Sequence, residues 1–417
     1  MKVIVAHPFQ QHSFKTAIAV KKNDSLYKYI TTVYFKRGTW TYFLSRILKG
    51  DNLKRIFGRR SELLEEEDVI VIAEWANLIL LLLQRIDKSH IIYNWWYWRV
   101  IDIFNSKLYD YIKNNDVDVV IVYDTVSASF IKKVKKNNLN IKVVVDMSAP
   151  NANYMYHIFE NENKNLGLYD KKNHKEFKNS YFLGKCQAAK YEIKNADAFL
   201  VASDFTKKSL EWDNIKEKRV FKCIYGVSSN IKNDYLQYKH SRKIICVYMG
   251  TVNLQKGAYR LFEAIREIRR NDIEFHFYGY YDKNSDYYHE FSHSVFFHGH
   301  IPHSKMLKEL EKSDIVIFPS FADGFGFSVT EGLVRNNIAI CSTNAGVSEL
   351  IVDKYNGFCY KPKNVKKLIK ILNELQIDKL RIMQKIAPLS ISEFTWTRYA
   401  QMLNKALENI IKESELE

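Results

Sequence analysis

The sequence predicts an α/β fold made of two doubly wound domains. Three observations support this prediction. A chain of 417 residues is too long for one ordinary hydrophobic core. Short β-branched runs alternate with segments of helical periodicity, which is typical of parallel sheets with crossover helices. A polar stretch of weak periodicity, residues 228–242, divides these runs into two series.

The first series contains seven strand candidates, most of them continuous apolar runs. They are residues 2–7, 29–34, 69–73, 118–123, 142–146, 198–201 and 219–225. Helical periodicity follows at residues 14–22 and 127–136. The longest apolar stretch, residues 69–83, is interrupted by Glu74 and Asn77 and is shorter than the ~20 residues of a membrane span. We therefore expect a strand there, followed by a buried helix.

The second series has the same alternation. Its strand candidates are residues 243–249, 273–278, 295–298, 315–318 and 338–341, and its helical segments are 259–270, 304–312 and 365–387. Residues 395–411 predict one terminal amphipathic helix. We expect domains at 1–238 and 239–393, with residues 394–417 as a helix that crosses back to the first domain.

Composition indicates a globular protein of a reducing compartment. Hydrophobic residues make up 47% of the chain and charged residues 26%, which excludes a disordered chain. The five cysteines have no paired spacing, so neither a disulfide framework nor a zinc site is expected. The N-terminal apolar run is too short for a signal peptide and reads as a first strand. We expect a cytoplasmic protein.

The net charge of +16 is unevenly distributed. Residues 1–240 hold 39 basic and 26 acidic side chains, a net of +13, whereas residues 241–417 hold 24 and 21, a net of +3. A basic first domain suits an anionic partner such as a phosphate-bearing lipid leaflet. A lysine-rich solvated surface explains any single basic cluster equally well. Nucleic acid is the weakest alternative, because no nucleic-acid-binding module is recognisable.

The most informative segment is residues 320–331, which read Ser-Phe-Ala-Asp-Gly-Phe-Gly-Phe-Ser-Val-Thr-Glu. It follows an apolar strand candidate and precedes a helix-compatible stretch. Glycines in such a loop let the backbone approach a ligand closely, and a helix N-terminus suits a phosphate. The carboxylate of Glu331 could accept hydrogen bonds from a ribose diol. The alternative is a capping box, with Ser328 as N-cap and Glu331 reaching back to its N–H.

A second loop of the same kind lies upstream. Gly250 follows a strand candidate, and Lys256-Gly257 precedes the next helical segment. The charge of Lys256 at this position could hold a diphosphate. Two phosphate-suited loops in one doubly wound domain favour a nucleotide site more strongly than either loop alone.

These motifs resemble the retaining glycosyltransferases of family 4, the glycosyl transferases group 1. That family has the GT-B fold, two Rossmann-like domains facing a cleft. The resemblance covers residues 197–410 well, and the first domain by organisation only. It rests on Gly250, Lys256-Gly257, the run Gly299-His300-Ile301, the pair Asp323 and Glu331 with seven residues between, and Gly346 to Glu349.

The resemblance implies a role for each matching residue. Glu331 would bind the ribose, and Lys256 with the amides of the glycine loop would hold the diphosphate. Asp323 would contact the donor sugar, and the backbone near His300 would read the base. With Lys256 and Asp323 as the catalytic pair, the expected donor-binding set is Gly250, Thr251, Lys256, Gly299, His300, Ile301, Asp323, Gly324, Phe325, Gly326, Phe327 and Glu331.

The sequence also departs from the family pattern. Asp323 and Thr251 stand where the family usually has Glu and Arg, so Lys256 would carry the leaving-group charge with little help. Paired glycines of the first domain are replaced by residues 10–12, and a strand-end histidine is replaced by Asp146. Gln11, His12 and Asp146 are therefore candidates for the acceptor side only.

Other polar clusters carry no site prediction. Asp116-Val-Asp118 resembles a metal-binding pair, but it precedes its strand and lies at the edge away from the expected cleft. No metal or other cofactor is expected. The histidines between His293 and His303 have no ligand spacing, so surface or packing roles are the expectation.

These observations predict a glycosyltransferase that moves a sugar from a nucleoside-diphosphate sugar to a glycan or lipid-linked glycan with retention, as in bacterial surface polysaccharide biosynthesis. The acceptor would bind the basic first domain, and the aromatic cluster of residues 95–98 could contact the inner face of the membrane. The alternatives are a sugar-nucleotide epimerase and a non-catalytic GT-B scaffold that pairs with an active transferase.

Overall fold

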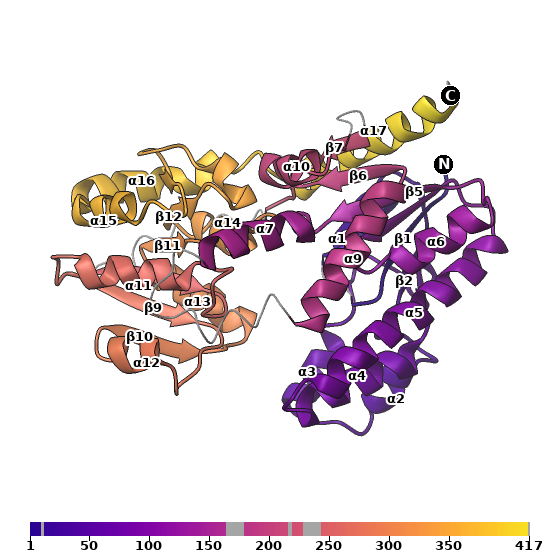
Figure 1. Ribbon diagram of the computed structural model, residues 1–417, viewed down its shortest axis with the longest axis horizontal. Coiled ribbons are helices and arrows are strands. Elements are labelled where there is room, and N and C mark those ends of the chain that lie inside the picture. The colour runs from indigo at the N-terminus through magenta and orange to yellow at the C-terminus, as the bar shows by residue number, and fades with distance from the viewer. Residues whose placement is uncertain (10–11, 164–178, 216–218, 228–242, 416–417) are drawn as a thin grey trace.

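The computed structural model describes residues 1–9, 12–163, 179–215, 219–227 and 243–415, and they form two α/β lobes (Figure 1). The first lobe contains a seven-stranded sheet and the second a six-stranded sheet. Every pairing between neighbouring strands of both sheets is parallel. The prediction of two doubly wound domains is confirmed, and the expected linker at 228–242 lies outside the described residues.

The first sheet has the order β3-β2-β1-β4-β5-β6-β7. Its strands are β1 (Val3–His7), β2 (Leu26–Thr31), β3 (Val69–Val71), β4 (Val119–Tyr123), β5 (Lys142–Met147), β6 (Ala198–Val201) and β7 (Val220–Lys222). All five residues of β1 and of β4 are buried, as continuous apolar strands require when helices cover both faces of a sheet. The central strands therefore form the core of this domain.

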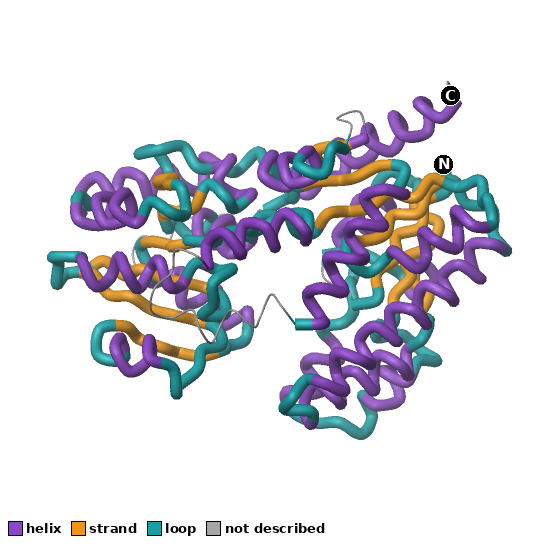
Figure 2. The backbone as a smooth tube through the Cα atoms, in the orientation of Figure 1, coloured by secondary structure: helices purple, strands orange, loops and turns teal. Residues whose placement is uncertain are grey.

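Helices cover both faces of this sheet (Figure 2). They are α1 (Ser13–Lys21), α2 (Trp40–Leu44), α3 (Asp51–Phe57), α4 (Glu74–Ile86), α5 (Ile91–Lys113), α6 (Ala128–Lys136), α7 (Ala152–Asn163), α9 (Ser180–Asn195) and α10 (Asp204–Glu211). A short 3₁₀ turn, η1 (Glu66–Asp68), leads into β3.

The second sheet has the order β10-β9-β8-β11-β12-β13. Its strands are β8 (Ile244–Met249), β9 (Ile273–Tyr278), β10 (Val295–Gly299), β11 (Ile315–Phe318), β12 (Ile338–Ser342) and β13 (Gly357–Tyr360). Its helices are α11 (Ala258–Glu267), α12 (Asp286–Phe291), α13 (His303–Lys312), α14 (Phe327–Leu333), η4 (Gly346–Leu350), α15 (Val365–Asn373) and α16 (Ile377–Ser390).

The last helix, α17 (Trp396–Glu415), packs on α1 of the first domain. Tyr399 Oη lies 3.1 Å from Thr16 Oγ1, and the Asn23 side-chain amide donates to the Ala400 carbonyl at 3.0 Å. The chain therefore begins and ends in the same lobe (Figure 1).

Several expected elements differ from the observed ones. The helical segment 365–387 is two helices, because residues 374–376 leave the helical path between α15 and α16. Strand β2 begins three residues before the expected position, and β13 was not expected. The helix after β3, expected to be buried, has buried residues on one face only. Within the described residues, no helix is long and apolar enough to cross a membrane.

Direct contacts join the two domains. Lys222 Nζ lies 2.5 Å from Glu349 Oε2, and Ser203 Oγ donates to the Gly324 carbonyl at 2.9 Å. A β-carbon added at Gly324 would lie 2.4 Å from the carbonyl oxygen of Ser148. Gly324 is therefore required for the close approach of its loop to the first domain.

Candidate functional site

A cavity of about 700 Å³ lies between the two domains. Its first-domain wall comes from the start of α1, the loop after β5 and the segment after β7. Its second-domain wall comes from the loop before α11 and from α14. The lining residues that carry charge or can titrate are His12, Lys15, Lys256, His303, Asp323, Glu331 and Arg335.

Lys256 is held in the cavity by the turn that begins α11. Its backbone N–H donates to Asn253 Oδ1 at 2.9 Å. Gly257 follows with φ of +69°, and a β-carbon there would lie 1.9 Å from the Pro319 carbonyl oxygen. Gly250 lies against the aliphatic part of Lys256. Gly257 thus allows the start of α11 to approach Pro319 closely, and the absence of a side chain at Gly250 leaves room for Lys256.

Lys256 forms an ion pair with Asp323. Its Nζ lies 2.5 Å from Asp323 Oδ2, and the Asp323 carboxylate also accepts the Phe325 N–H at 3.3 Å. The Asp323 side chain is only 15% exposed, so little water screens the pair. The two predicted catalytic residues are therefore in direct contact.

The loop after Asp323 opens α14 at the cavity wall. Gly326 is the N-cap of α14 with φ of +107°, and no side chain caps the helix. The capping box considered for Ser328 and Glu331 is wrong, because Ser328 lies inside the helix. Phe325 turns away from the cavity and packs edge-on against Tyr225 at a centroid distance of 5.4 Å. Asn336 adopts φ of +57°, a left-handed conformation that Asn tolerates just beyond a helix.

Glu331 projects from α14 and binds His303 at the start of α13. Glu331 Oε1 lies 2.8 Å from His303 Nε2. The hydrogen bond to Glu331 raises the pKa of His303, against a smaller opposing effect of burial. His303 was expected to have a surface or packing role; its side chain is 67% exposed, and it also lines the cavity.

Two more cations reach the cavity. Arg335 Nη1 donates to the Glu331 carbonyl at 3.0 Å. Lys15 Nζ lies 5.2 Å from the ring centre of Trp396, and burial lowers the pKa of Lys15. Neither residue was predicted, although each had a signal in the sequence. Arg335 follows Glu331 by four residues, and Lys15 follows the flagged His12 by three.

His12 belongs to a buried polar cluster on the first-domain side. Its Nε2 lies 2.8 Å from Tyr225 Oη and 3.4 Å from Asp146 Oδ2. Tyr225 Oη also donates to Asp146 Oδ1 at 3.1 Å, and Thr16 Oγ1 donates to Asp146 Oδ2 at 3.4 Å. Burial, and then the charge of Asp146, raises the pKa of Tyr225, so its hydroxyl stays protonated. Asp146 and Tyr225 thereby hold the His12 ring by its Nε2.

The predicted residues divide into those that line the cavity and those that do not. Lys256, Asp323, Gly324, Phe327, Glu331 and His12 line it. Gly250, Thr251, Gly299, His300, Ile301, Phe325, Gly326 and Asp146 do not, and Gln11 lies outside the described residues. Ile301 borders a neighbouring hollow with Tyr278 and His298, two residues before His303 in the chain.

The described part of the chain contains no group of three or more His, Cys, Asp or Glu side chains arranged to hold a metal ion. The Asp116-Val-Asp118 pair lies at the start of β4, where Asp116 pairs with Lys2 at 2.9 Å. All five cysteines are free.

Residues 232–387 match the model of the family described as glycosyl transferases group 1. This region of the second domain is therefore similar to that family. The matched region contains the second-domain wall of the cavity, including Lys256, Asp323 and Glu331.

Two curated relatives match about half of this chain. An uncharacterised glycosyltransferase of Methanocaldococcus jannaschii is 23% identical over 231 residues, which cover 53% of this chain and 62% of the relative. A Campylobacter jejuni protein, N,N'-diacetylbacillosaminyl-diphospho-undecaprenol alpha-1,3-N-acetylgalactosaminyltransferase, is 25% identical over 239 residues, or 54% of this chain and 63% of the relative. The chain thus matches less than two thirds of each relative's length.

The fold of the chain also matches solved structures along nearly its whole length. Sucrose-phosphate synthase from Thermosynechococcus elongatus aligns with a TM-score of 0.66 at 12% identity, covering 99% of this chain and 100% of that one. At this identity the likeness concerns the fold, and it confirms the expected GT-B arrangement.

Proposed function

We propose that this protein is a glycosyltransferase that moves a sugar from a nucleoside-diphosphate sugar to a glycan or lipid-linked glycan, with retention of configuration. The observation that carries the proposal is the meeting of Lys256, Asp323 and Glu331 in a cavity that the first domain closes. Nucleotide ligands of doubly wound domains bind beyond the carboxyl ends of the strands, where these residues lie.

The donor would replace two contacts that residues of the site make with each other. Its ribose diol would bind Glu331 in place of His303, and its diphosphate would bind Lys256 in place of Asp323. Asp323, released from Lys256, would accept hydrogen bonds from the donor sugar. Gly324 and Phe327 would line the diphosphate site, and the nearby backbone of Gly299, His300 and Ile301 would read the base.

Catalysis would be electrostatic. When the bond between the anomeric carbon and the diphosphate oxygen breaks, negative charge grows on the departing diphosphate. A fixed lysine charge in a site shielded from water stabilises that charge without reorganisation, and this is usually the largest contribution to rate. Arg335 and Lys15 add positive potential from two sides of the cavity. They compensate for Thr251, which is exposed and outside the cavity.

The acceptor would enter from the first-domain side, next to His12. Because Tyr225 and Asp146 engage Nε2 of His12, the tautomer protonated at Nε2 is favoured, and Nδ1 is left to accept a hydrogen bond from a substrate hydroxyl. The C. jejuni relative is named for a lipid-linked acceptor. By analogy we propose that the acceptor of this chain is a polyprenyl-diphosphate-linked glycan. The chain would use it at the inner face of the membrane in surface polysaccharide biosynthesis, and the reaction would need no metal.

The proposal is tested with the whole chain, a nucleoside-diphosphate sugar and a polyprenyl-diphosphate-linked glycan. Release of nucleoside diphosphate is followed over time, and the anomeric configuration of the product is determined by NMR. The expected result is release that accelerates with acceptor and a product of the donor's configuration. An inverted product refutes retention. Epimerised donor without transfer supports the epimerase, and no turnover with any donor supports the scaffold.

A further inference from the structure

Exposed hydrophobic side chains are concentrated in one part of the first domain. Among the described residues, 22 large hydrophobic side chains are exposed, and 12 of them lie between Trp40 and Trp95. This segment forms α2, α3, α4 and the start of α5, which gather at one end of the lobe, away from both termini (Figure 1). Such a concentration in a monomer indicates an interaction surface.

Helix α4 exposes apolar side chains on its outer face. Its inner face buries Glu74, Ala76, Asn77 and Leu80. Its outer face exposes Trp75, Ile79, Leu82 and Ile86, which are spaced by four, three and four residues and so form one stripe. An exposed apolar stripe of this kind favours an apolar environment outside the core of the domain.

Neighbouring helices extend this stripe. On α2, Trp40 and Phe43 are exposed and their rings lie 6.3 Å apart. At the start of α5, Ile91, Ile92 and Trp95 are exposed, Ile91 by 73%. We call these nine side chains, four on α4, two on α2 and three on α5, the apolar surface. It contains three tryptophans, a residue type enriched at the interface of a bilayer with water.

Specific contacts fix the helices that carry the apolar surface. The buried Glu74 carboxylate accepts hydrogen bonds from the N–H groups of Trp40 and Thr41, each at 2.8 Å, which joins α4 to α2. Arg85 donates to Asn52 at 3.1 Å and joins α4 to α3. These hydrogen bonds join the three helices to one another.

Basic side chains lie beside part of the apolar surface. Residues 40–60 hold six basic side chains and one acidic side chain, whereas residues 61–95 hold two basic and seven acidic ones. Arg55, Arg59 and Arg85 border a groove of about 340 Å³ between α2, α3 and α4, whose floor includes Leu44, Ile56 and Leu78. At the other end, the Arg99 guanidinium lies 5.5 Å from the ring centre of Trp95. Cations beside exposed aliphatic and aromatic groups complement anionic phosphate groups above acyl chains.

We propose that the apolar surface docks this protein on an anionic lipid bilayer, with the outer face of α4 in the acyl boundary and the neighbouring arginines and lysines on lipid phosphates. The inference depends on the proposed function only for the purpose of docking, which would be to give the site access to a lipid-linked acceptor. A contact links the chain segments that carry the surface and the site: Phe9, three residues before His12 of the cavity, stacks on Tyr97, two residues after Trp95 of the apolar surface, at 4.9 Å. Docking itself requires no substrate.

The test is co-sedimentation of the whole chain with vesicles of phosphatidylglycerol and phosphatidylcholine, and with phosphatidylcholine alone. Wild type should bind the anionic vesicles, and 1 M salt should weaken binding because it shortens the screening length from about 10 Å to about 3 Å. The triple variant Ile79→Asn, Leu82→Gln, Ile86→Asn should bind at least about tenfold more weakly. Bromine-labelled acyl chains should quench tryptophan fluorescence in wild type and much less in this variant.

A matched control carries Ile377→Asn, Ile382→Asn and Leu389→Gln, three exposed apolar residues of the second domain. It should bind vesicles like wild type. A second variant, Arg46→Glu, Lys49→Glu, Lys54→Glu and Arg55→Glu, should lose at least about 100-fold, because each basic residue near the membrane contributes about fivefold. Donor binding measured without vesicles should be unchanged in every variant, which separates failure to dock from failure of the proposed function.

Three results would overturn the proposal. One is equal binding of anionic vesicles by wild type and by the α4 triple variant. Another is binding to phosphatidylcholine alone as tight as to the anionic mixture. The third is no vesicle binding by a wild type that dimerises through α4, because the occupant of the apolar surface would then be a second copy of this chain.

Discussion

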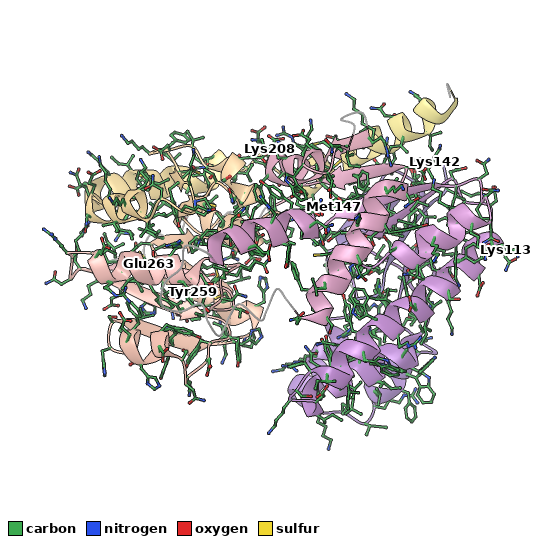
Figure 3. The ribbon with its side chains drawn as sticks, viewed as in Figure 1. Lys113, Lys142, Met147, Lys208, Tyr259 and Glu263 are labelled. Carbon is green, nitrogen blue, oxygen red and sulfur yellow. The ribbon has the colours of Figure 1, made fainter. Side chains whose placement is uncertain are left out.

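The two walls of the cavity are built in different ways. In the second domain, Lys256, Asp323 and Glu331 come from two strand–loop–helix units in which the polar residue is close in sequence to its supporting glycine. In the first domain, His12, Asp146 and Tyr225 come from three separate places in the chain and meet only in the folded structure. Side chains throughout both lobes are drawn in Figure 3, where Met147 marks the end of β5, one residue beyond Asp146.

The two walls should therefore differ in how substitutions in the sequence affect their geometry. A wall made of short local units keeps its geometry as long as each loop keeps its glycine and its polar residue. A wall made of distant residues depends on the whole sheet and on α17, since Tyr399 bonds to Thr16, which bonds to Asp146. We therefore assign general donor chemistry to the second-domain wall, and acceptor-side chemistry to the first-domain wall.

The largest expected effect is on the donor wall. Lys256→Ala should lower turnover by ~10²–10³-fold, since it removes a preorganised charge at the departing diphosphate. Steady-state release of nucleoside diphosphate measures it, with the exposed Lys361→Ala as the control. Activity of Lys256→Ala within a few-fold of wild type, with folding intact, would remove Lys256 from the mechanism.

Glu331→Gln should weaken donor binding without unfolding the protein. Losing a charged acceptor costs about 1.5–3 kcal/mol, or about ten- to 150-fold in dissociation constant. Because Glu331 does not cap α14, the melting temperature should stay nearly constant. Calorimetric titration with donor and a thermal melt check both statements. A large loss of stability with unchanged donor affinity would show that Glu331 acts in folding only.

Substitutions in the first-domain wall should have smaller effects on the rate of transfer, and these effects should not be additive. His12→Ala and Asp146→Asn should each lower the rate of transfer about tenfold, near the upper limit for one hydrogen bond. The double variant should be little worse than either single variant, because Asp146 acts by positioning His12. Additive losses would contradict the coupling. Hydrolysis of the donor by water serves as the control, since it needs the second-domain wall only.

The smallest effect concerns pH. Bonding to Glu331 raises the pKa of His303 above its ordinary 6.5. The charged pair is complete below pH 6.5 and is lost as pH rises through the raised pKa, so its stabilisation disappears at high pH. Glu331 then becomes available to ribose, and donor affinity should increase up to about fivefold between pH 6 and pH 8.5. The same slope in His303→Gln would exclude this explanation.

Much of the fold could be predicted because parallel strands buried on both faces are continuous apolar runs. Strands β4, β11 and β12 are examples, and their predicted bounds lie within one residue of the observed ones. Strand β13 escaped prediction because Gly357 to Tyr360 is short and flanked by polar residues. The exposure of the outer face of α4 could not be predicted, because an apolar run does not indicate which face of the helix other elements cover.

The candidate site could be predicted where its residues are close in sequence. The segment from Asp323 to Glu331 carries its loop, its helix start and its carboxylates together. The contact of His303 with Glu331 spans 28 residues, and that of Tyr225 with His12 spans 213. No local pattern encodes such pairings, because tertiary packing decides them.

The central claim is that the interdomain cavity binds a nucleoside-diphosphate sugar through Lys256 and Glu331. A thermal-shift titration of wild type with UDP-, GDP-, dTDP- and ADP-sugars tests it most directly. At 100 times its dissociation constant a ligand adds about 2.7 kcal/mol to stability. We predict that at least one donor raises the melting temperature, and that Lys256→Ala and Glu331→Gln require higher donor concentrations for the same rise. No response to any of the four, or identical responses in wild type and both variants, would contradict the claim.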